Sequence, residues 1–280
     1  IMMSLLLVII VVLAVHGLTL EGSMEGVKFY LLPDFERMKE VGIWETVTAA
    51  MNQAFFTLSL GIGSMAIFGS YIDKKQTLLG EAVNIAVLDT FVALVSGLII
   101  FPTCFAFGIS PDAGPQLIFV TLPNVFNSMA GGRIWGTLFF VFMTFAAFST
   151  ILAVFENIIS CCMDLFHWGR KKACGVNLIV ITVLSLPCVL GYNLWSFFQP
   201  LGEGSTILDL EDFAVSNVIL PVGSLCYLLF CVSRYGWGFD RYLEETNMGT
   251  GLKMPKGLRI YLSYILPVLL VLLIVLGLTG

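Results

Sequence analysis

The stretch AFFTLSLGIGSMAIFGSYI, residues 54–72, is apolar enough to lie in a bilayer but carries weak helix formers in its middle. Its centre holds Thr57, Ser59, Gly61 and Gly63, and a glycine inside a helix costs about 1 kcal/mol relative to alanine. A helix that opens at membrane depth exposes amide and carbonyl groups, which are costly unless polar partners meet them. The stretch therefore predicts either a broken helix whose break faces a polar site or a Gly-x-Gly motif that allows close helix packing.

The whole chain has the composition of an integral membrane protein. Of its 280 residues, 58% are hydrophobic and only 12% are charged, and the mean hydropathy is +0.94. Charges in such proteins gather in loops and orient the chain, so the net charge of -5 says little about partners. No basic cluster suggests nucleic acid, and the seven cysteines form no CxxC pair, so we assign them no metal or disulfide role.

Seven apolar segments are long enough to span a bilayer. They cover residues 1–20, 44–72, 79–107, 133–165, 173–198, 207–233 and 258–279. Ten of the 14 basic residues lie around three alternate connections, those after the second, fourth and sixth segments. Because cytoplasmic loops are enriched in lysine and arginine, we expect this side to be the cytoplasm, with residue 1 inside and residue 280 outside.

Two groups of polar positions lie inside these segments. Asp89 is several turns from either loop, and a charge at the bilayer centre costs roughly 2.5–3.5 kcal/mol on a lenient scale, so we expect it to meet a cation or a proton. Ala146, Ser149 and Thr150 offer one carbonyl and two hydroxyls on one helix face. Such oxygens suit a hard cation, although serine and threonine hydroxyls also bond to carbonyls of their own helix.

Four strings resemble the neurotransmitter:sodium symporter family, in its bacterial amino-acid transporter branch. They are LPDF at 32–35, FFTLSLGIG at 55–63, FVTLP at 119–123 and FAAFST at 145–150. The resemblance runs over essentially all 280 residues and corresponds to the fifth to eleventh membrane segments of the family. It implies an all-α integral membrane protein with a discontinuous-helix, inverted-repeat transporter fold, of which the chain holds the second repeat plus flanking helices.

The same resemblance implies four parts, with about seven transmembrane helices in all. They are the last helix of a missing first repeat, an extracellular loop, the second repeat, and a cytoplasmic connector with the final transmembrane helix, at residues 1–20, 21–43, 44–233 and 234–280. Inside the second repeat we expect the broken helix at 44–72 and an occluding loop at 108–132. Residues 1–20 lack a basic leader and have the length of a full span, which favours a fragment over a signal peptide.

Residue by residue, the resemblance implies one substrate site and two sodium sites. It implies substrate contacts at Phe56, Thr57, Ser59, Gly61, Ile62, Thr150 and Val154. The first sodium site would use Thr57 and Asp89. The second would use the Ala146 carbonyl with Ser149 and Thr150.

Asp89 departs from the family pattern, which commonly has asparagine there. Animal relatives bind chloride nearby, at positions that here are Gln53 and Ala93 among others. Because Asp89 supplies a negative charge of its own, we expect transport that does not require chloride.

Three positions resemble the family's gates. Asp212 matches an outer carboxylate, Asp164 an inner one, and Tyr71 the tyrosine beside the inner gate. From the residues alone, Asp164 is an ordinary boundary charge ahead of a basic loop.

The implied function is sodium-coupled symport of a neutral amino acid across the plasma membrane, the bacterial inner membrane. The chain would be part of a secondary active transporter and no enzyme, and its partners would be the amino acid, sodium ions, membrane lipid and the missing N-terminal segments. It would carry about half of the substrate and sodium sites. The alternative is a non-transporting truncated fragment or a structural membrane subunit.

Overall fold

The computed structural model describes residues 2–108, 122–129, 131–202 and 204–279. All regular structure in this part is helical, apart from one isolated bridge between Gln76 and Thr250. The predicted all-α class is therefore confirmed. Residues 109–121 and 130 of the predicted occluding loop lie outside the described residues.

Five helices in the described ranges are long and apolar enough to cross a membrane. They are Leu78–Ala106, Gly132–Phe166, Arg170–Gly191, Ile207–Val232 and Leu258–Leu278. A sixth candidate is the pair Met3–Leu18 and Ser23–Leu31, bent by 117°. The remaining predicted segment, 44–72, forms two shorter helices. Hydropathy alone placed the spans well but could not show a bend or a break.

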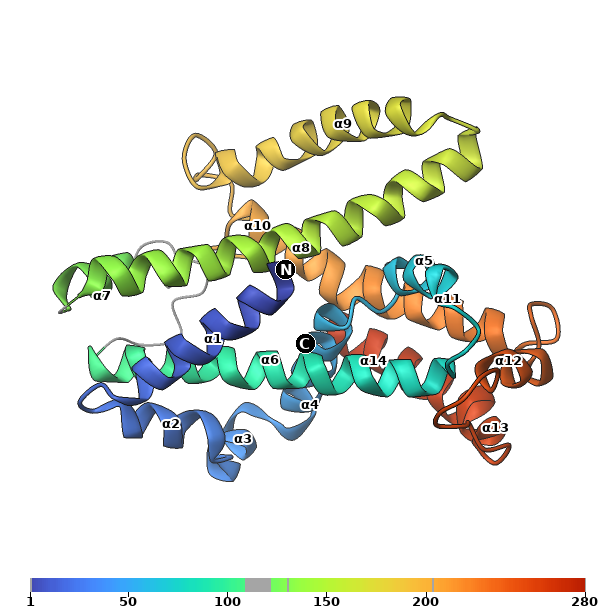
Figure 1. Ribbon diagram of the computed structural model, residues 1–280, viewed down its shortest axis with the longest axis horizontal. Coiled ribbons are helices and arrows are strands. Elements are labelled where there is room, and N and C mark those ends of the chain that lie inside the picture. The colour runs from blue at the N-terminus through green and yellow to red at the C-terminus, as the bar shows by residue number, and fades with distance from the viewer. Residues whose placement is uncertain (1, 109–121, 130, 203, 280) are drawn as a thin grey trace. The chain divides into compact units, whose positions relative to one another are not determined.

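Contacts divide the chain into two compact units. The first unit comprises Ile1–Arg37 and Ala86–Leu152. Its helices are α1 (Met2–Leu18), α2 (Ser23–Leu31), most of α6 (Leu78–Ala106), α7 (Leu122–Ser128) and the first part of α8 (Gly132–Phe166) (Figure 1). The short α3 (Phe35–Val41) crosses the boundary between the units.

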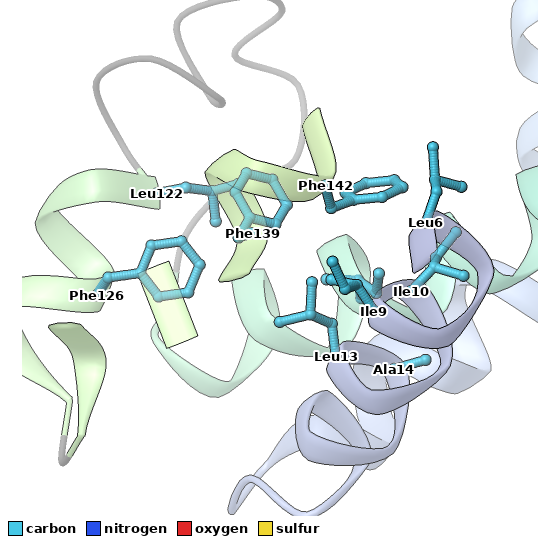
Figure 2. Close-up of a cluster of buried hydrophobic side chains, with 10 residues drawn as sticks. Leu6, Ile9, Ile10, Leu13, Ala14, Leu122, Phe126, Phe139 and Phe142 are labelled. Atoms are coloured by element: carbon cyan, nitrogen blue, oxygen red, sulfur yellow. The ribbon is translucent and has the colours of Figure 1, made fainter. Parts of the chain in front are cut away.

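One face of α1 builds the core of the first unit. Figure 2 shows Leu6, Ile9, Ile10, Leu13 and Ala14 of α1 gathered with Leu122 and Phe126 of α7 and with Phe139 and Phe142 of α8. Their spacing of three and four along α1 puts them on one side of that helix. Ile10 is 0% exposed and Phe139 is 1% exposed. Because lipid is as apolar as these side chains, dispersion contacts within the cluster hold it together.

The second unit comprises Met38–Ile85 and Ala153–Gly280. Besides the start of α6 and the end of α8, it contains α4 (Ile43–Thr57), α5 (Ser64–Tyr71), α9 (Arg170–Gly191), α10 (Ile207–Phe213), η2 (Ala214–Ile219), α11 (Leu220–Val232), α12 (Phe239–Thr246), α13 (Leu258–Ile260), η3 (Tyr261–Ile265) and α14 (Leu266–Thr279). Its core includes a buried cluster of Phe55, Leu220, Leu270 and Leu273. The predicted second repeat, residues 44–233, is a division by family resemblance and not by contacts, and it stays a prediction.

Two membrane helices of this unit contain a wide π-helical turn. The elements η2 and η3 both end immediately before a Leu-Pro pair, at Pro221 and Pro267. Proline has no backbone N–H and its ring crowds the carbonyl four residues earlier. A locally widened turn accommodates that crowding without ending the helix.

The fifth predicted segment ends earlier than expected. Hydropathy suggested 173–198, whereas α9 begins at Arg170 and ends at Gly191. A Cβ at Gly191 would lie 3.2 Å from the Ile207 Cβ, so this end of α9 packs closely on the start of α10. The apolar residues after Gly191 form turns, which a hydropathy window cannot distinguish from helix.

The loop after α5 is attached to the connector between α11 and α13. The Thr250 amide donates to the Lys75 carbonyl at 2.9 Å, and Lys74 pairs with Glu245 at 3.3 Å. Gln76 and Thr250 form the isolated parallel bridge. Two of the three predicted basic connections therefore meet, as expected if they lie on one side of the membrane.

Candidate functional site

The predicted break in residues 44–72 is confirmed. α4 ends at Thr57 and α5 begins at Ser64, and the residues between them form a linker, 58–63, that belongs to neither helix. Three linker residues have positive φ: Ser59 at 52°, Gly61 at 82° and Gly63 at 91°. Glycine enters this left-handed region without steric cost, which explains why the linker carries two glycines.

Gly61 packs directly against the start of α11. A Cβ at Gly61 would collide with the Leu220 carbonyl oxygen and lie 2.8 Å from the Ser224 amide nitrogen. A Cβ at Gly223 would in turn lie 3.0 Å from the Gly61 carbonyl carbon. Close packing and the positive φ thus both require glycine at position 61, so the break in the helix and the close packing coexist.

Asn157 of α8 binds the linker backbone. Its Nδ2 donates to the Ile62 carbonyl oxygen at 2.9 Å, and the residue is only 7% exposed. A Cβ at Gly63 would lie 3.5 Å from the Asn157 Oδ1 and 2.5 Å from the Tyr227 hydroxyl. Sequence reasoning missed Asn157, although an amide inside an apolar helix is itself a signal, because in lipid it needs a partner.

A cavity of about 370 Å³ borders the linker within the second unit. Of the seven predicted substrate contacts it includes Ser59 and Gly61, and α5, α11 and α14 complete its walls. Its polar groups are mainly hydroxyls, among them that of Ser224, whose Oγ is buried and has no hydrogen-bond partner in the described part of the chain. The cavity therefore suits an apolar group better than a charged one.

The three predicted ligands of the second sodium site lie together on α8, in the first unit. The Ser149 hydroxyl donates to the Ala146 carbonyl at 2.8 Å, and the Thr150 hydroxyl donates to the same oxygen at 3.3 Å. The back-bonding alternative is thus what the structure shows. The same arrangement gathers one carbonyl and two hydroxyl oxygens, a donor set that fits a hard monovalent cation.

The predicted partners of the first sodium site lie on different units. Thr57 ends α4 in the second unit, and Asp89 is half-buried in α6 in the first. Gln53 is exposed on α4, and the Ala93 carbonyl accepts a hydrogen bond from the Tyr30 hydroxyl at 3.1 Å. This site and the chloride-equivalent positions stay predictions.

The remaining predicted substrate contacts also lie on several elements: α4, the linker and α8. Phe56 is 49% exposed at the end of α4. Thr150 and Val154 lie four residues apart on α8, and therefore on one face of that helix. Ile62 lies in the linker and is partly buried.

A charged cluster joins α5, α8 and α9. Arg170 makes a bidentate pair with Glu156, at 3.1 Å to Oε1 and 2.6 Å to Oε2. The Tyr71 hydroxyl donates to the same Oε1 at 3.3 Å. Tyr71 was predicted to lie beside a gate, whereas Glu156 and Arg170 were not singled out. A polar residue at position 156, inside an apolar helix, was the available signal.

The two predicted gate carboxylates, Asp164 and Asp212, lie outside this charged cluster. Asp164 is exposed near the end of α8. The Asp212 carboxylate accepts a hydrogen bond from the Ser216 hydroxyl at 3.1 Å, within one helical turn. The nearby Asp209 completes a capping box with Thr206 at the start of α10, so it has a structural role of its own.

Discontinuous helices inside apolar segments are found in many secondary transporters. The sequence pattern of the Sodium:neurotransmitter symporter family matches residues 1–279. The chain belongs to this family. The predicted recognition and fold class are therefore confirmed.

Individual relatives agree with this assignment. The chain is 36% identical over 230 residues to the uncharacterized sodium-dependent transporter YhdH of Bacillus subtilis, covering 82% of this chain and 50% of the relative. It is 31% identical over 275 residues to an uncharacterized sodium-dependent transporter of Haemophilus influenzae, covering 98% of this chain and 58% of the relative. The chain thus spans between half and three fifths of the length of these relatives.

A solved structure is similar over almost the whole chain. It is the crystal structure of MhsT in complex with L-phenylalanine, with a TM-score of 0.85 and 36% sequence identity. The match covers 99% of this chain and 61% of MhsT. The broken helix thus belongs to a known transporter architecture.

Proposed function

We propose that this chain is part of a sodium-coupled symporter of a neutral amino acid and carries about half of the substrate and sodium sites. The observation that carries the proposal is the linker 58–63, an opened backbone inside an apolar segment. Openings of this kind are tolerated in membranes where they line a site. In broken-helix transporters, the half-helix ends at such an opening bind the substrate and the coupling ions.

An amino-acid substrate agrees with the chemistry of a broken helix. The start of a half-helix carries a partial positive charge that favours a carboxylate, and the end of a half-helix carries a partial negative charge that favours an ammonium group. The related MhsT was crystallised with L-phenylalanine, a neutral amino acid. We therefore propose this substrate class, with Phe56, Thr150 and Val154 among the contacts.

Sodium coupling is sufficient to concentrate such a substrate. One monovalent cation moving down 100 mV contributes about 2.3 kcal/mol, and a tenfold gradient adds about 1.4 kcal/mol. Together they support a substrate gradient of roughly 500-fold per ion. A zwitterion has no net charge, so the membrane potential does not oppose its uptake. The oxygens of Ala146, Ser149 and Thr150 would hold one such ion.

The test is uptake into proteoliposomes by the longest gene product that contains this chain, with the 280 residues alone as the comparison. We expect labelled neutral amino acids to accumulate only when sodium is outside, and only with the longer product. Accumulation in potassium as well as in sodium would contradict the coupling. No accumulation by a folded longer product would favour a non-transporting membrane component.

A further inference from the structure

The carbonyl of Ile62 needs a partner that the broken helix does not supply. The next carbonyl, that of Gly63, accepts from the amides of Ala66 and Ile67 at 3.0 and 3.2 Å and so belongs to the first turn of α5. Ile62 lies just before that turn, and the partner of its carbonyl is the Asn157 amide at 2.9 Å. An unpaired carbonyl in hydrocarbon is costly, so this bond stabilises the backbone conformation in which the linker is observed.

Asn157 is held so that its amide points at the linker. The residue is buried, and on the other end of its amide the Cys161 thiol lies 3.9 Å from Oδ1. A Cβ at Gly63 would lie 3.5 Å from the amide oxygen, which is an ordinary van der Waals contact. The Nδ2 group faces the Ile62 carbonyl and donates to it.

The position of Asn157 on α8 links the linker to the predicted binding residues. Thr150, Val154 and Asn157 are spaced by four and three residues, so they share one face of α8. Thr150 and Val154 are predicted substrate contacts, and Ile62 is another. The bond from Asn157 therefore joins the two elements that carry these contacts.

We propose that Asn157 is a positioning residue of the transport site: its Nδ2–H···O=C bond to Ile62 fixes the opened linker in the conformation that binds substrate. The proposal rests on the proposed function, because it assigns Asn157 a role in that same site. Asn157 touches no substrate in this role. It acts through the backbone of the linker.

Uptake by the full-length protein separates this role from simple packing. Asn157→Leu keeps a side chain of similar size but removes the N–H donor. We expect KM for labelled L-phenylalanine to rise about tenfold, as loss of one buried hydrogen bond to the binding conformation implies, while kcat changes less than about threefold. Asn157→Gln keeps the amide and should return KM to within about threefold of the wild-type value.

Asn177 provides a matched control. It is also a membrane-helix asparagine that is 7% exposed, but its Nδ2 donates to the Ala173 carbonyl of its own helix at 2.9 Å and to the Cys162 Sγ of α8 at 3.6 Å, and these partners lie outside the linker. Asn177→Leu should leave KM unchanged. If Asn157→Leu does not fold, Asn157→Ala removes the same amide without adding apolar bulk.

Hydrogen–deuterium exchange gives a readout that does not depend on transport. We expect amides of residues 58–66 to exchange at least tenfold faster in Asn157→Leu but not in Asn177→Leu, since the linker has lost its anchor. A folded variant with unchanged exchange and unchanged KM would overturn the positioning role. Faster exchange in a protein that shows no sodium-dependent uptake would show that Asn157 anchors the linker, but would refute both the proposed function and a positioning role in transport.

Discussion

Asp89 is a single residue that places a carboxylate inside an apolar helix, at a position predicted to bind sodium. The half-buried carboxylate lies in α6, a membrane-spanning helix. Ionisable residues inside membrane helices are rare and commonly mark ion or proton pathways. We expect it to contribute both a sodium ligand and the negative charge that chloride supplies in animal relatives.

Asp89→Asn tests this role. We expect the half-saturating sodium concentration of the full-length protein to rise about tenfold, because a full negative charge near the ion is lost. Replacing chloride by gluconate should leave wild-type uptake unchanged and lower uptake by the variant. Asp240→Asn is the control, since that exposed carboxylate lies in α12, outside the membrane spans, and pairs with Arg259 at 3.3 Å. Equal sodium curves for Asp89→Asn and wild type would refute the prediction.

The pair between Arg170 and Glu156 should contribute little to stability. The arginine side chain is 60% exposed and the glutamate 24%, so solvent weakens their attraction. A double-mutant cycle with Arg170→Gln and Glu156→Gln, followed by thermal unfolding in detergent, should give a coupling of about 1 kcal/mol or less. A coupling of about 3 kcal/mol would show instead that the pair behaves as a buried one.

Residues close in sequence were placed correctly from spacing alone. Ala146, Ser149 and Thr150 lie within one turn of any helix, and their oxygens do meet at 2.8 and 3.3 Å. Asn157 and Ile62 are 95 residues apart, and no local pattern joins them. Such a contact depends on how the helices pack, and sequence spacing does not reveal that packing.

Among the elements, the linker between α4 and α5 makes the strongest demand on residue type. Gly61→Ala would place a Cβ against the Leu220 carbonyl and force alanine to a φ of 82°. We expect the variant to lose about 2–4 kcal/mol of stability, from the left-handed backbone and the steric conflict together. The thermal midpoint in detergent is the measurement.

Gly69→Ala is the matched control for Gly61→Ala. Gly69 lies in α5, and a Cβ there would meet nothing within 4 Å. Alanine is the better helix former, so this variant should gain about 0.5–1 kcal/mol. Equal losses from both variants would show that the linker is no more sensitive to a side chain than α5 is, and would contradict the prediction.

Element type was easier to predict than element ends. The break was predicted, with close packing as the alternative, because Thr57, Ser59, Gly61 and Gly63 are weak helix formers, and the structure shows it. The end of α9 at Gly191 was missed, because apolar turn residues and apolar helix residues have the same hydropathy. The π turns at η2 and η3 were missed as well, although Pro221 and Pro267 mark their positions.

For the molecule as a whole, the distribution of basic residues predicts its orientation. Reporter fusions test it, with a fluorescent protein active only in the cytoplasm and alkaline phosphatase active only outside. We expect cytoplasmic activity for insertions in 73–76, 167–169 and 247–256, and external activity for those in 20–22 and 199–202. The contact between Lys75 and Thr250 requires the first and third of these insertion sites to agree. Opposite activities at those two sites would contradict the arrangement of the second unit.

The short helix α5 is fastened at both ends to the same part of the chain. Before α5, Gly61 packs against α11; after α5, the Lys75 carbonyl accepts a hydrogen bond from the Thr250 amide of the connector. Because these contacts hold α5 on both sides, we expect α5 and the connector to move together. We therefore expect an antibody fragment that binds the connector to slow transport without contacting the substrate site.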